Sequence, residues 1–593
     1  MRNNRINQLR ELMRERGITV YIIPTSDYHQ SEYISGYFKT RQFLTGFTGS
    51  AGTAVVTMDE ACLWTDGRYF IQAERELEGS EIRLFKMGME GVPDIKEYVE
   101  ERMNPEACIG FDGKVLCAQD GMDYAGIAED HNASVRSGED LVGMIWKDRP
   151  AFPCSSMFVL EEKYAGKSTA EKLKDVRKKM SGYGAEVHVL SDACDIAWLL
   201  NIRGADISHV PVVLSFVLMD MENCFWYVNR EKLNEEVCRY LSDNHIIIKD
   251  YNDIYSDVEK IKKKMILADL RKINYKLRCS ADTDILDYSN PEELMKSMKN
   301  PVEIENIRNA HIKDGVAVTK FMYWLKNTIG RETITEMDAA RHMDELRAGL
   351  EHYVDISFDT IAAYGSNAAM MHYKADETCN TELEPKGFLL VDSGGHYLEG
   401  STDITRTFAL GEISEEEKLM FTAVVRGNLN LADAKFLYGC SGLNLDILAR
   451  EPLWQLGMDY RCGTGHGNGY LLNVHEGPNS FRWRKLPGVI DDIPVQEGMI
   501  TTDEPGVYEE GRYGIRIENE LLCKKGVKNE YGQFMEFENI TYAPIDLDAI
   551  DAGEMTGRER KLLNDYHKKV YEVISPYLND AEKKWLQEYT REI

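Results

Sequence analysis

The pattern of apolar positions in the first part of the chain predicts helices and strands in alternation. Four apolar residues near the N-terminus recur at helical spacing: Ile6, Leu9, Leu12 and Met13. The apolar run of residues 20–23 follows as a strand, and further strands are predicted at residues 53–57 and 62–64, where Thr-Asp-Gly supplies a turn. This order predicts an α/β domain over residues 1–153, which ends in a polar connector with two prolines.

The next part of the chain repeats this plan loosely. The matched segments are residues 187–192 with 21–27, 201–204 with 44–46, 212–218 with 53–57, and 225–228 with 62–64. The match is weak at individual positions, so two unrelated α/β units remain an alternative to an internal duplication. We favour duplication and predict a second, related α/β domain over residues 154–300.

A third region begins where Pro301 suits the first turn of a helix, because that position needs no backbone N–H donor. Residues at helical spacing follow: Ile304, Ile307, His311, Val316, Val318, Phe321, Trp324 and Leu325. Strands are predicted at residues 388–393, 402–410, 499–504 and 514–522. A closing helix carries Leu562, Leu563, Tyr566, Val570, Val573 and Tyr577. We therefore predict a third domain over residues 301–593.

Charge and composition exclude several classes of function. The 593 residues include 99 acidic and 70 basic side chains, which give a net charge of −29. A surface this negative repels phosphate backbones and anionic lipids, so we expect neither a nucleic-acid partner nor a membrane-surface role. Hydrophobic residues make up 43% of the chain, which is enough for large buried cores and argues against disorder.

The N-terminus and the cysteines indicate a compartment. The first residues carry scattered charges where a signal peptide would have an apolar core. The longest apolar stretch, residues 210–219, is half the length of the ~20 residues that cross a membrane. The twelve cysteines lie far apart and form no Cys-x-x-Cys pair, a usage typical of reduced thiols. We therefore expect a cytoplasmic protein without a membrane segment.

Two aspartates stand at the ends of neighbouring apolar strands. Asp392 ends the run Phe-Leu-Leu-Val-Asp, and Asp403 lies at the start of the next predicted strand. A hairpin between these strands would place both carboxylates on one face. Adjacent buried carboxylates either share a proton or bind a cation, whereas a lone aspartate most often caps a turn.

A glycine-rich segment, Cys-Gly-Thr-Gly-His-Gly-Asn-Gly, carries the next candidate, His466. Its glycines allow close backbone approach around the histidine. The segment lacks the third glycine of the Gly-x-Gly-x-x-Gly pattern, which excludes dinucleotide binding. A lone histidine is usually structural, so His466 becomes informative only together with other polar groups.

Two glutamates complete the candidates. Glu504 ends one predicted strand, and Glu518 lies in another, where isoleucines alternate with Arg516 and Glu518. A solvated sheet face would explain this alternation for either glutamate taken alone, so neither position is informative by itself.

The conjunction of five polar residues near strand ends in one region changes that assessment: Asp392, Asp403, His466, Glu504 and Glu518. Two divalent cations would balance the charge of the four carboxylates. Oxygen-rich ligation with one imidazole suits Mn²⁺, Co²⁺ or Fe²⁺ better than a thiolate zinc site. Two such ions ~3.5–4 Å apart can share a water, lower its pKa towards ~7 and polarise a carbonyl. Residue chemistry alone therefore predicts a dimetal hydrolase.

Several runs of sequence resemble a known family. VDSGG, STDITRTF, GTGHG, NVHEGP, TDEPG and GIRIEN are similar to motifs of the pita-bread metallopeptidases, specifically the aminopeptidase P (Xaa-Pro aminopeptidase) family. SDYHQSEYI, GFTGSAGTAVVT, WTDGRYF, NIRGADISHVPV and NAHIKDGVAV resemble its long cytosolic form. The resemblance covers nearly the whole chain. It implies an α/β (α+β) fold, with two creatinase-like domains before a C-terminal pita-bread catalytic domain.

The resemblance also implies a role for each candidate ligand. Asp392 would bind one of two metal ions, Asp403 and Glu518 would bridge both, and His466 and Glu504 would complete the second site. Glu504 would also be the base that assists a hydroxide held between the metals. The implied cofactor is a pair of divalent ions, with Mn²⁺ favoured and Co²⁺, Fe²⁺ and Zn²⁺ as alternatives.

Three further residues acquire roles by the same resemblance. His475 would bind the scissile carbonyl side of the substrate and steady its developing charge. His372 would lie near the proline of the substrate, and Arg516 would orient metal ligands without touching the metals. The family often has a histidine four residues before the metal-binding histidine, where this chain has Cys462, which puts fine specificity in doubt. Residues 479–492 also look longer than the family pattern.

The implied activity is release of the N-terminal residue from peptides with proline in second position, by a homodimeric enzyme. Prolidase, which cleaves Xaa-Pro dipeptides with similar ligands, is the nearest alternative. Two predicted N-terminal domains favour the aminopeptidase, because prolidases resemble two-domain proteins. A non-catalytic pita-bread binding protein or a metal-free amidinohydrolase resembling creatinase is disfavoured, since all five candidate ligands are present.

Overall fold

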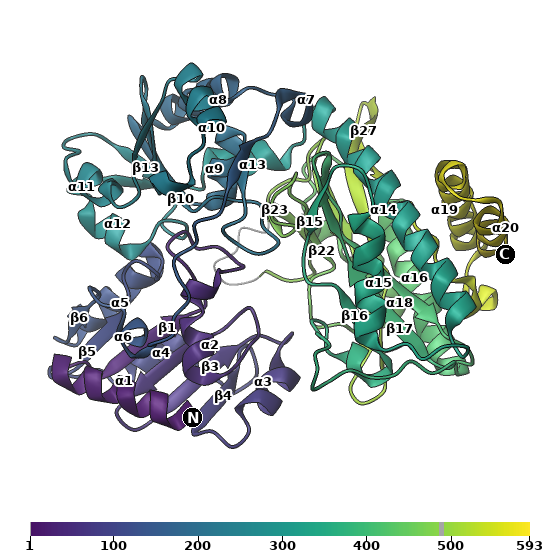
Figure 1. The fold of residues 1–593 in the computed structure, drawn as a ribbon, viewed down its shortest axis with the longest axis horizontal. Coiled ribbons are helices and arrows are strands. Elements are labelled where there is room, and N and C mark those ends of the chain that lie inside the picture. Colours follow the sequence, from purple (N-terminus) through teal and green to yellow (C-terminus); the bar gives the residue numbers. More distant parts are fainter. Residues whose placement is uncertain (1, 486–491) are drawn as a thin grey trace. The chain divides into compact units, whose positions relative to one another are not determined.

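The computed structural model describes residues 2–485 and 492–593. The chain divides into two compact units, one of Met1–Glu161 with Lys167–Glu292 and one of Glu162–Gly166 with Glu293–Ile593. Each unit combines sheets with flanking helices (Figure 1), which confirms the predicted α/β class. None of the described helices is long and apolar enough to cross a membrane.

The first unit begins with a six-stranded sheet and its helices. The strands are β1 (Val20–Pro24), β2 (Thr53–Thr57), β3 (Ala61–Thr65), β4 (Ile82–Lys86), β5 (Cys108–Phe111) and β6 (Ser134–Arg136). The helices are α1 (Arg2–Arg16), α2 (Thr40–Thr45), α3 (Phe70–Leu77), α4 (Ile95–Glu100), α5 (Ala118–Asp130) and α6 (Leu141–Ile145). The strand order is β4-β3-β2-β1-β5-β6. As predicted, α1 turns Ile6, Leu9 and Met13 into the core.

A second six-stranded sheet completes this unit. Its strands are β8 (Val187–Leu190), β10 (Ser215–Asp220), β11 (Cys224–Val228), β12 (Ile246–Asp250), β13 (Ile266–Ala268) and β14 (Ile285–Asp287), and a separate pair consists of β7 (Met157–Val159) and β9 (Ile202–Gly204). The helices are α8 (Thr169–Tyr183), α9 (Ala193–Leu200), α10 (Glu235–Asp243), α11 (Asp253–Glu259), α12 (Tyr275–Ser280) and α13 (Pro291–Ser297), the last of which contains the boundary between the units.

The two sheets have the same topology. The second has the order β12-β11-β10-β8-β13-β14, and its antiparallel and parallel pairings follow those of the first strand by strand. Such agreement in order and direction confirms the predicted pair of related domains. The exact boundaries at residues 153 and 300 stay a prediction.

One predicted correspondence between the repeats is wrong. Gly46 ends α2 in the left-handed conformation with φ of 75°, and the residue that ends α9 in this way is Asn201, with φ of 51°. Gly204, which the sequence match aligned with Gly46, lies in β9 instead. Glycine and asparagine both tolerate the left-handed region at a helix end, so a Gly-to-Gly match misaligned the two repeats.

The second unit holds the region of candidate chemistry. Its strands are β15 (Tyr353–Ile356), β16 (Ile361–Tyr364), β17 (Phe388–Ser393), β18 (Gly395–Tyr397), β19 (Gly400–Ser401), β20 (Ile404–Ala409), β21 (Lys435–Leu437), β22 (Gly465–Gly467), β23 (Glu476–Phe481), β24 (Ile500–Asp503), β25 (Gly506–Glu509), β26 (Tyr513–Arg516), β27 (Asn519–Asn529) and β28 (Gly532–Asn539). The largest sheet has the order β21-β28-β27-β24-β22-β23, and a second one has the order β16-β17-β20.

Helices cover these sheets, with α14 and α15 side by side in Figure 1. The helices of this unit are α7 (Glu162–Ala165), α14 (Pro301–Thr328), α15 (Glu336–Ala348), α16 (Glu415–Ala432), α17 (Gly442–Leu445), α18 (Ile447–Trp454), α19 (Gly557–Ile574) and α20 (Asp580–Tyr589). Short 3-10 helices in the chain are η1 (Gly36–Phe38), η2 (Arg230–Lys232), η3 (Gly365–Ala369), η4 (Leu547–Ala549), η5 (Ala552–Glu554) and η6 (Ser575–Tyr577).

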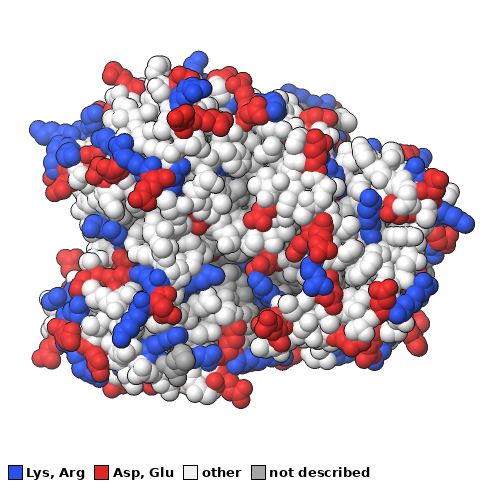
Figure 2. Space-filling view, viewed as in Figure 1, with Lys and Arg blue, Asp and Glu red and all other residues white. Residues whose placement is uncertain are grey.

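On the face in Figure 2, acidic and basic side chains are interspersed.

The predicted long helix begins as the sequence indicated. The side-chain oxygen of Asn300 accepts hydrogen bonds from the N–H groups of Val302 and Glu303. The carboxylate of Glu303 in turn accepts from the N–H of Asn300, and Pro301 lies in the first turn. This reciprocal cap satisfies N–H groups that lack a partner within the helix. It fixes the start of α14, whose buried face includes His311 and Asp314.

The strand predicted at residues 514–522 is in fact two strands. β26 ends at Arg516 and pairs with β25, whereas β27 begins at Asn519 and pairs with β24 and β28. Glu518 lies between them, and its N–H donates to the carbonyl of Thr405 at 3.1 Å. The alternation of apolar and charged residues over 515–518 includes the residues between the two strands, so the sequence pattern does not reveal the break.

A buried ion pair clamps the segment between Asp392 and Asp403. Arg347 donates to Asp314 at 2.5 Å and also to the carbonyl of Ser393 at 3.1 Å. Asp314 in turn accepts from the hydroxyl of Thr402 at 2.9 Å. Because Ser393 follows Asp392 and Thr402 precedes Asp403, one ion pair holds both carboxylate-bearing strands in register.

Removal of one partner of this pair should be strongly destabilising. We expect Arg347→Met to lower the free energy of unfolding by about 3–5 kcal/mol, because the Asp314 carboxylate would stay buried and unpaired. Arg341→Met, in the same helix but exposed, should cost about 0–1 kcal/mol. Urea denaturation of both variants makes the comparison, and equal losses would contradict the role of the clamp.

Candidate metal centre

Two adjacent strands bring the candidate aspartates together. Asp392 in β17 lies opposite Thr405 of β20, and Asp403 immediately precedes β20. Between these two strands the chain forms β18 and β19, which belong to a separate three-stranded sheet with β15. The predicted proximity of the two strands is therefore present, although the connection is longer than a simple hairpin.

His466 lies in β22 with its Nε2 atom aimed at carboxylates. Nε2 is 3.6 Å from Asp403 Oδ2 and 3.5 Å from Glu504 Oε1. Its Nδ1 atom lies 3.0 Å from the carbonyl of Gly467 and 3.1 Å from that of Val474. Carbonyl oxygens only accept, so we assign the proton to Nδ1, which leaves the lone pair of Nε2 available to a cation.

The two glutamates reach the same place from different strands. Glu504 follows β24, and its N–H donates to the carbonyl of Thr464 at 2.8 Å. Glu518 accepts from the hydroxyl of Thr405 at 2.7 Å. Ligand atoms of Asp403, His466 and Glu518 all lie within 4.8 Å of one another. This spacing is compatible with a shared cation.

Burial and crowding make the carboxylates unfavourable as anions. Desolvation raises the pKa values of Asp403 and Glu518 well above their usual range, and neighbouring carboxylates raise them further. Desolvation likewise raises the pKa of Glu504 to about 7, against the lowering effects of Arg516 and His475. Four carboxylates therefore share a site to which Arg516 contributes one positive charge.

One oxygen atom provides a direct test of whether cations fit here. Asp392 Oδ1 is buried and has no hydrogen-bond partner among the described residues. A buried acceptor without a partner is costly, and a bound cation would satisfy it. Carboxylate oxygens with one imidazole nitrogen are also the ligands that hard and borderline divalent ions prefer. The site therefore fits divalent cations.

Arg516 orients the carboxylate of Asp392. Its Nη2 atom donates to Asp392 Oδ2 at 2.5 Å, Nε donates to the hydroxyl of Thr405 at 3.1 Å, and Nη1 donates to the hydroxyl of Tyr508 at 2.8 Å. A guanidinium fixed at three points presents one oxygen of Asp392 and leaves the other unbonded. The geometry is consistent with the predicted orienting role.

The two remaining histidines lie in different places. The ring centroid of His475 is 4.3 Å from that of His466, with the planes at 89°. His372 lies on a separate, half-buried loop after η3. η3, which precedes that loop, packs on β26, since a Cβ on Gly514 would come within 1.9 Å of the carbonyl oxygen of Ala368.

Cys462 and the predicted loop of residues 479–492 also have defined positions. Cys462 packs half-buried against the hydrophobic core beneath α16, together with Tyr508. Residues 479–481 belong to β23, so the loop is shorter than predicted at its start. Residues 486–491 of that loop lie outside the described residues.

The sequence reasoning missed a buried glutamate that supports Asp403. Glu520 accepts from the N–H of Asp403 at 2.8 Å and from the side chain of Asn468 at 2.7 Å. Nε2 of His311 lies 3.2 Å from its other oxygen. The available signals were a glutamate two residues after Glu518 and a histidine on an apolar helix face.

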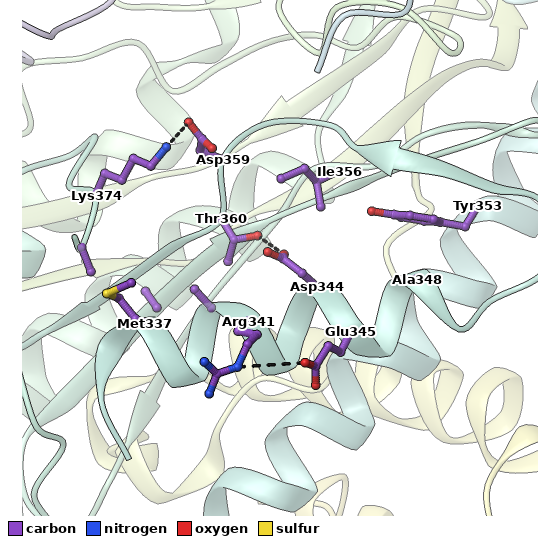
Figure 3. A pocket seen from close by; sticks show the side chains of 13 residues that line it. Met337, Arg341, Asp344, Glu345, Ala348, Tyr353, Ile356, Asp359, Thr360 and Lys374 are labelled. Atoms are coloured by element: carbon purple, nitrogen blue, oxygen red, sulfur yellow. Dashed lines mark hydrogen bonds and ion pairs between the residues drawn. The ribbon is translucent and has the colours of Figure 1, made fainter. Parts of the chain in front are cut away.

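A separate cavity of about 390 Å³ lies along α15 and around β15 and β16 (Figure 3). In it, Lys374 pairs with Asp359 at 2.7 Å and Thr360 donates to Asp344 at 2.6 Å. Its described lining residues include none of the candidate site residues. The cavity is therefore distinct from the metal centre.

Sequence families account for nearly the whole chain. Profiles described as the creatinase/prolidase N-terminal domain match residues 5–133 and 148–303. The profile of metallopeptidase family M24 matches residues 305–525, and that of the C-terminal region of M24 peptidases matches residues 533–593. The five candidate ligands all lie within the M24 match.

Individual proteins are similar over the same length. Aminopeptidase P1 of Arabidopsis thaliana is 35% identical, with 99% of each chain covered. The crystal structure of an X-prolyl aminopeptidase from Caenorhabditis elegans, described as a cytosolic enzyme with a di-nuclear active site, is 31% identical, with a TM-score of 0.95 and 100% of both chains covered.

A dipeptidase is a more distant structural neighbour. The Xaa-Pro dipeptidase of Bacillus anthracis is 22% identical, with a TM-score of 0.51, and the match covers 64% of this chain and 99% of the dipeptidase. That likeness shows a shared fold alone. Full-length identity, the order of the matched domains and the convergent carboxylates agree with one another: the chain belongs to the aminopeptidase P (Xaa-Pro aminopeptidase) family of M24 metallopeptidases.

Proposed function

We propose that the protein is a metal-dependent aminopeptidase that releases the N-terminal residue from peptides with proline in second position. The observation that carries this proposal is the convergence of Asp403, His466 and Glu518 on one point, in a chain similar to aminopeptidases P from end to end. Prolidase is the alternative activity, and the dipeptidase likeness offers it support only at the level of fold. A non-catalytic binding role is not favoured, because the candidate ligands are retained.

The cofactor in this proposal is a pair of divalent cations, with Mn²⁺ favoured and Co²⁺, Fe²⁺ or Zn²⁺ as alternatives. The residues that would hold them are Asp392, Asp403, His466, Glu504 and Glu518. Bound cations would supply a polarised substrate carbonyl and an activated water. The C. elegans enzyme is described as having a di-nuclear site, which supports a count of two.

The chain's own groups would carry out the remaining steps. A carboxylate oxygen of Glu504 would take the proton of the attacking water and pass it towards the leaving nitrogen. His475, beside His466, would donate a hydrogen bond to the carbonyl oxygen as negative charge develops there. Arg516 would keep Asp392 in one orientation, and His372 would contact the proline ring of the substrate.

Cellular context follows from properties of the chain. We propose a cytoplasmic location, supported by twelve cysteines that form no disulfide.

We also propose a homodimer. Its support is a group of exposed large apolar side chains in the second unit: Ile447, Leu448, Trp454, Leu456 and Trp483. The rings of Trp454 and Trp483 stack edge to face at 6.0 Å, and exposed apolar patches of this kind mark protein–protein contacts.

Two substitutions separate the proposed roles. Glu504→Gln removes the base and one ligand charge, so kcat should fall by at least about 10²-fold. His475→Ala should also lower kcat by about 10²-fold, because a donor to the developing charge is lost, while metal content stays near that of the unmodified enzyme. Steady-state kinetics with metal analysis test both. Near-normal rates in both variants with metal still bound would show the roles to be wrong.

Four substrates test the proposed activity. Proline in second position makes the scissile bond a tertiary amide, without an N–H group, that a site must be shaped to accept. We expect fast cleavage of Xaa-Pro-Yaa tripeptides, slower cleavage of Xaa-Ala-Yaa and of the dipeptide Xaa-Pro, and almost none of N-acetyl-Xaa-Pro-Yaa. Comparison of kcat/KM across the set decides the matter. A preference for the dipeptide would support prolidase, and indifference to proline would contradict both activities.

A further inference from the structure

A buried glutamate outside the metal centre holds the loop that carries His372. Glu336 is the first residue of α15 and is fully buried. Its carboxylate accepts hydrogen bonds from four donor groups of residues 364–381. The donors are the N–H of Tyr364 (2.7 Å), the amide of Asn367 (3.0 Å), the hydroxyl of Tyr373 (2.8 Å) and the N–H of Thr381 (2.9 Å). One side chain thus ties the start, middle and end of the loop together.

The bonding pattern favours a carboxylate over an amide at this position. Both oxygens of Glu336 act as acceptors, and the four donors that face them include two backbone N–H groups. A glutamine would present an NH₂ group, itself a donor, to half of these partners.

His372 is restrained on its C-terminal side within this loop. Tyr373, which follows it directly, is buried and bonded to Glu336. Lys374 comes next and pairs with Asp359 at the edge of the cavity in Figure 3. The backbone on the C-terminal side of His372 is therefore tied to α15 and to the segment before β16. A shift at Glu336 would move the histidine.

We propose that Glu336 is a positioning residue for His372, which fixes residues 364–381 and thereby sets the preference for proline over alanine in second position. The inference rests on the proposed function, since it gives His372 its contact with the substrate's proline. Glu336 itself touches none of the described candidate ligands through the bonds that hold the loop.

Glu336→Gln in the metal-loaded, full-length enzyme tests the proposal. The ratio of kcat/KM for Xaa-Pro-Yaa to that for Xaa-Ala-Yaa should fall about tenfold, in line with the loss of one hydrogen bond to a charged group. Metal content should stay unchanged, and amide hydrogens of residues 364–381 should exchange faster with solvent. An equal loss of activity on both substrates, with the ratio unchanged, would overturn the proposal.

Glu559→Gln provides a matched control. Glu559 is also a buried glutamate in the first turn of a helix, and it accepts from Arg426 at 3.0 Å and from Asn430 at 3.1 Å. Its bonds lie at α19 and involve no residue of the His372 loop. The control should leave the proline-to-alanine ratio and the exchange of residues 364–381 as in the unmodified enzyme, and a matching change would overturn the proposal.

Tyr373→Phe covers the case in which Glu336→Gln does not fold. It deletes one of the four donors and retains the ring, so the proline-to-alanine ratio should fall in the same direction by less than tenfold. An unchanged ratio with unchanged amide exchange would overturn the role of Glu336. A lack of proline preference in the unmodified enzyme would instead contradict the proposed function, and amide exchange would then decide the positioning of the loop by itself.

Discussion

Repulsion among four carboxylates in a confined, poorly solvated site is the constraint on which the second unit depends. Carboxylate oxygens of Asp403 and Glu518 lie within 4.8 Å of each other, and burial together with neighbouring acids raises their pKa values. The free protein must hold these groups together against their mutual repulsion and their loss of hydration. Regular strands do so: β17, β20, β22 and β24 each end or pass at the site, and their ladder hydrogen bonds leave the ligands little freedom.

A surrounding layer of hydrogen bonds then holds three of the candidate ligands in place. Arg516 holds one oxygen of Asp392, Glu520 holds the backbone of Asp403, and carbonyl groups select the tautomer of His466. The Asp314–Arg347 pair braces the segment that joins the two aspartates. Metal sites need such support, because ligand orientation determines both affinity and the properties of the bound ion.

Sequence reasoning singled out the candidate ligands because each lies close to an apolar strand, where an acidic residue or histidine is unusual. It placed α14 for an equally local reason, the Asn300-Pro301 helix start. It missed Glu336 and Glu520, whose partners are distant in sequence, so that each resembles a solvent-facing charge until the chain is folded. The break between β26 and β27 escaped notice because the alternation runs through the residues between them. The match of residues 201–204 with 44–46 did not show that Asn201, and not Gly204, occupies the left-handed helix end.

The central claim is that these carboxylates and His466 are assembled to hold two divalent cations. Crystals of the protein loaded with Mn²⁺ and measured at the manganese absorption edge test it most directly. The account predicts two anomalous peaks ~3.5–4 Å apart, in contact with Asp403 and Glu518. Peaks located away from these residues, or a fully active crystal form with no peak at this site, would contradict it.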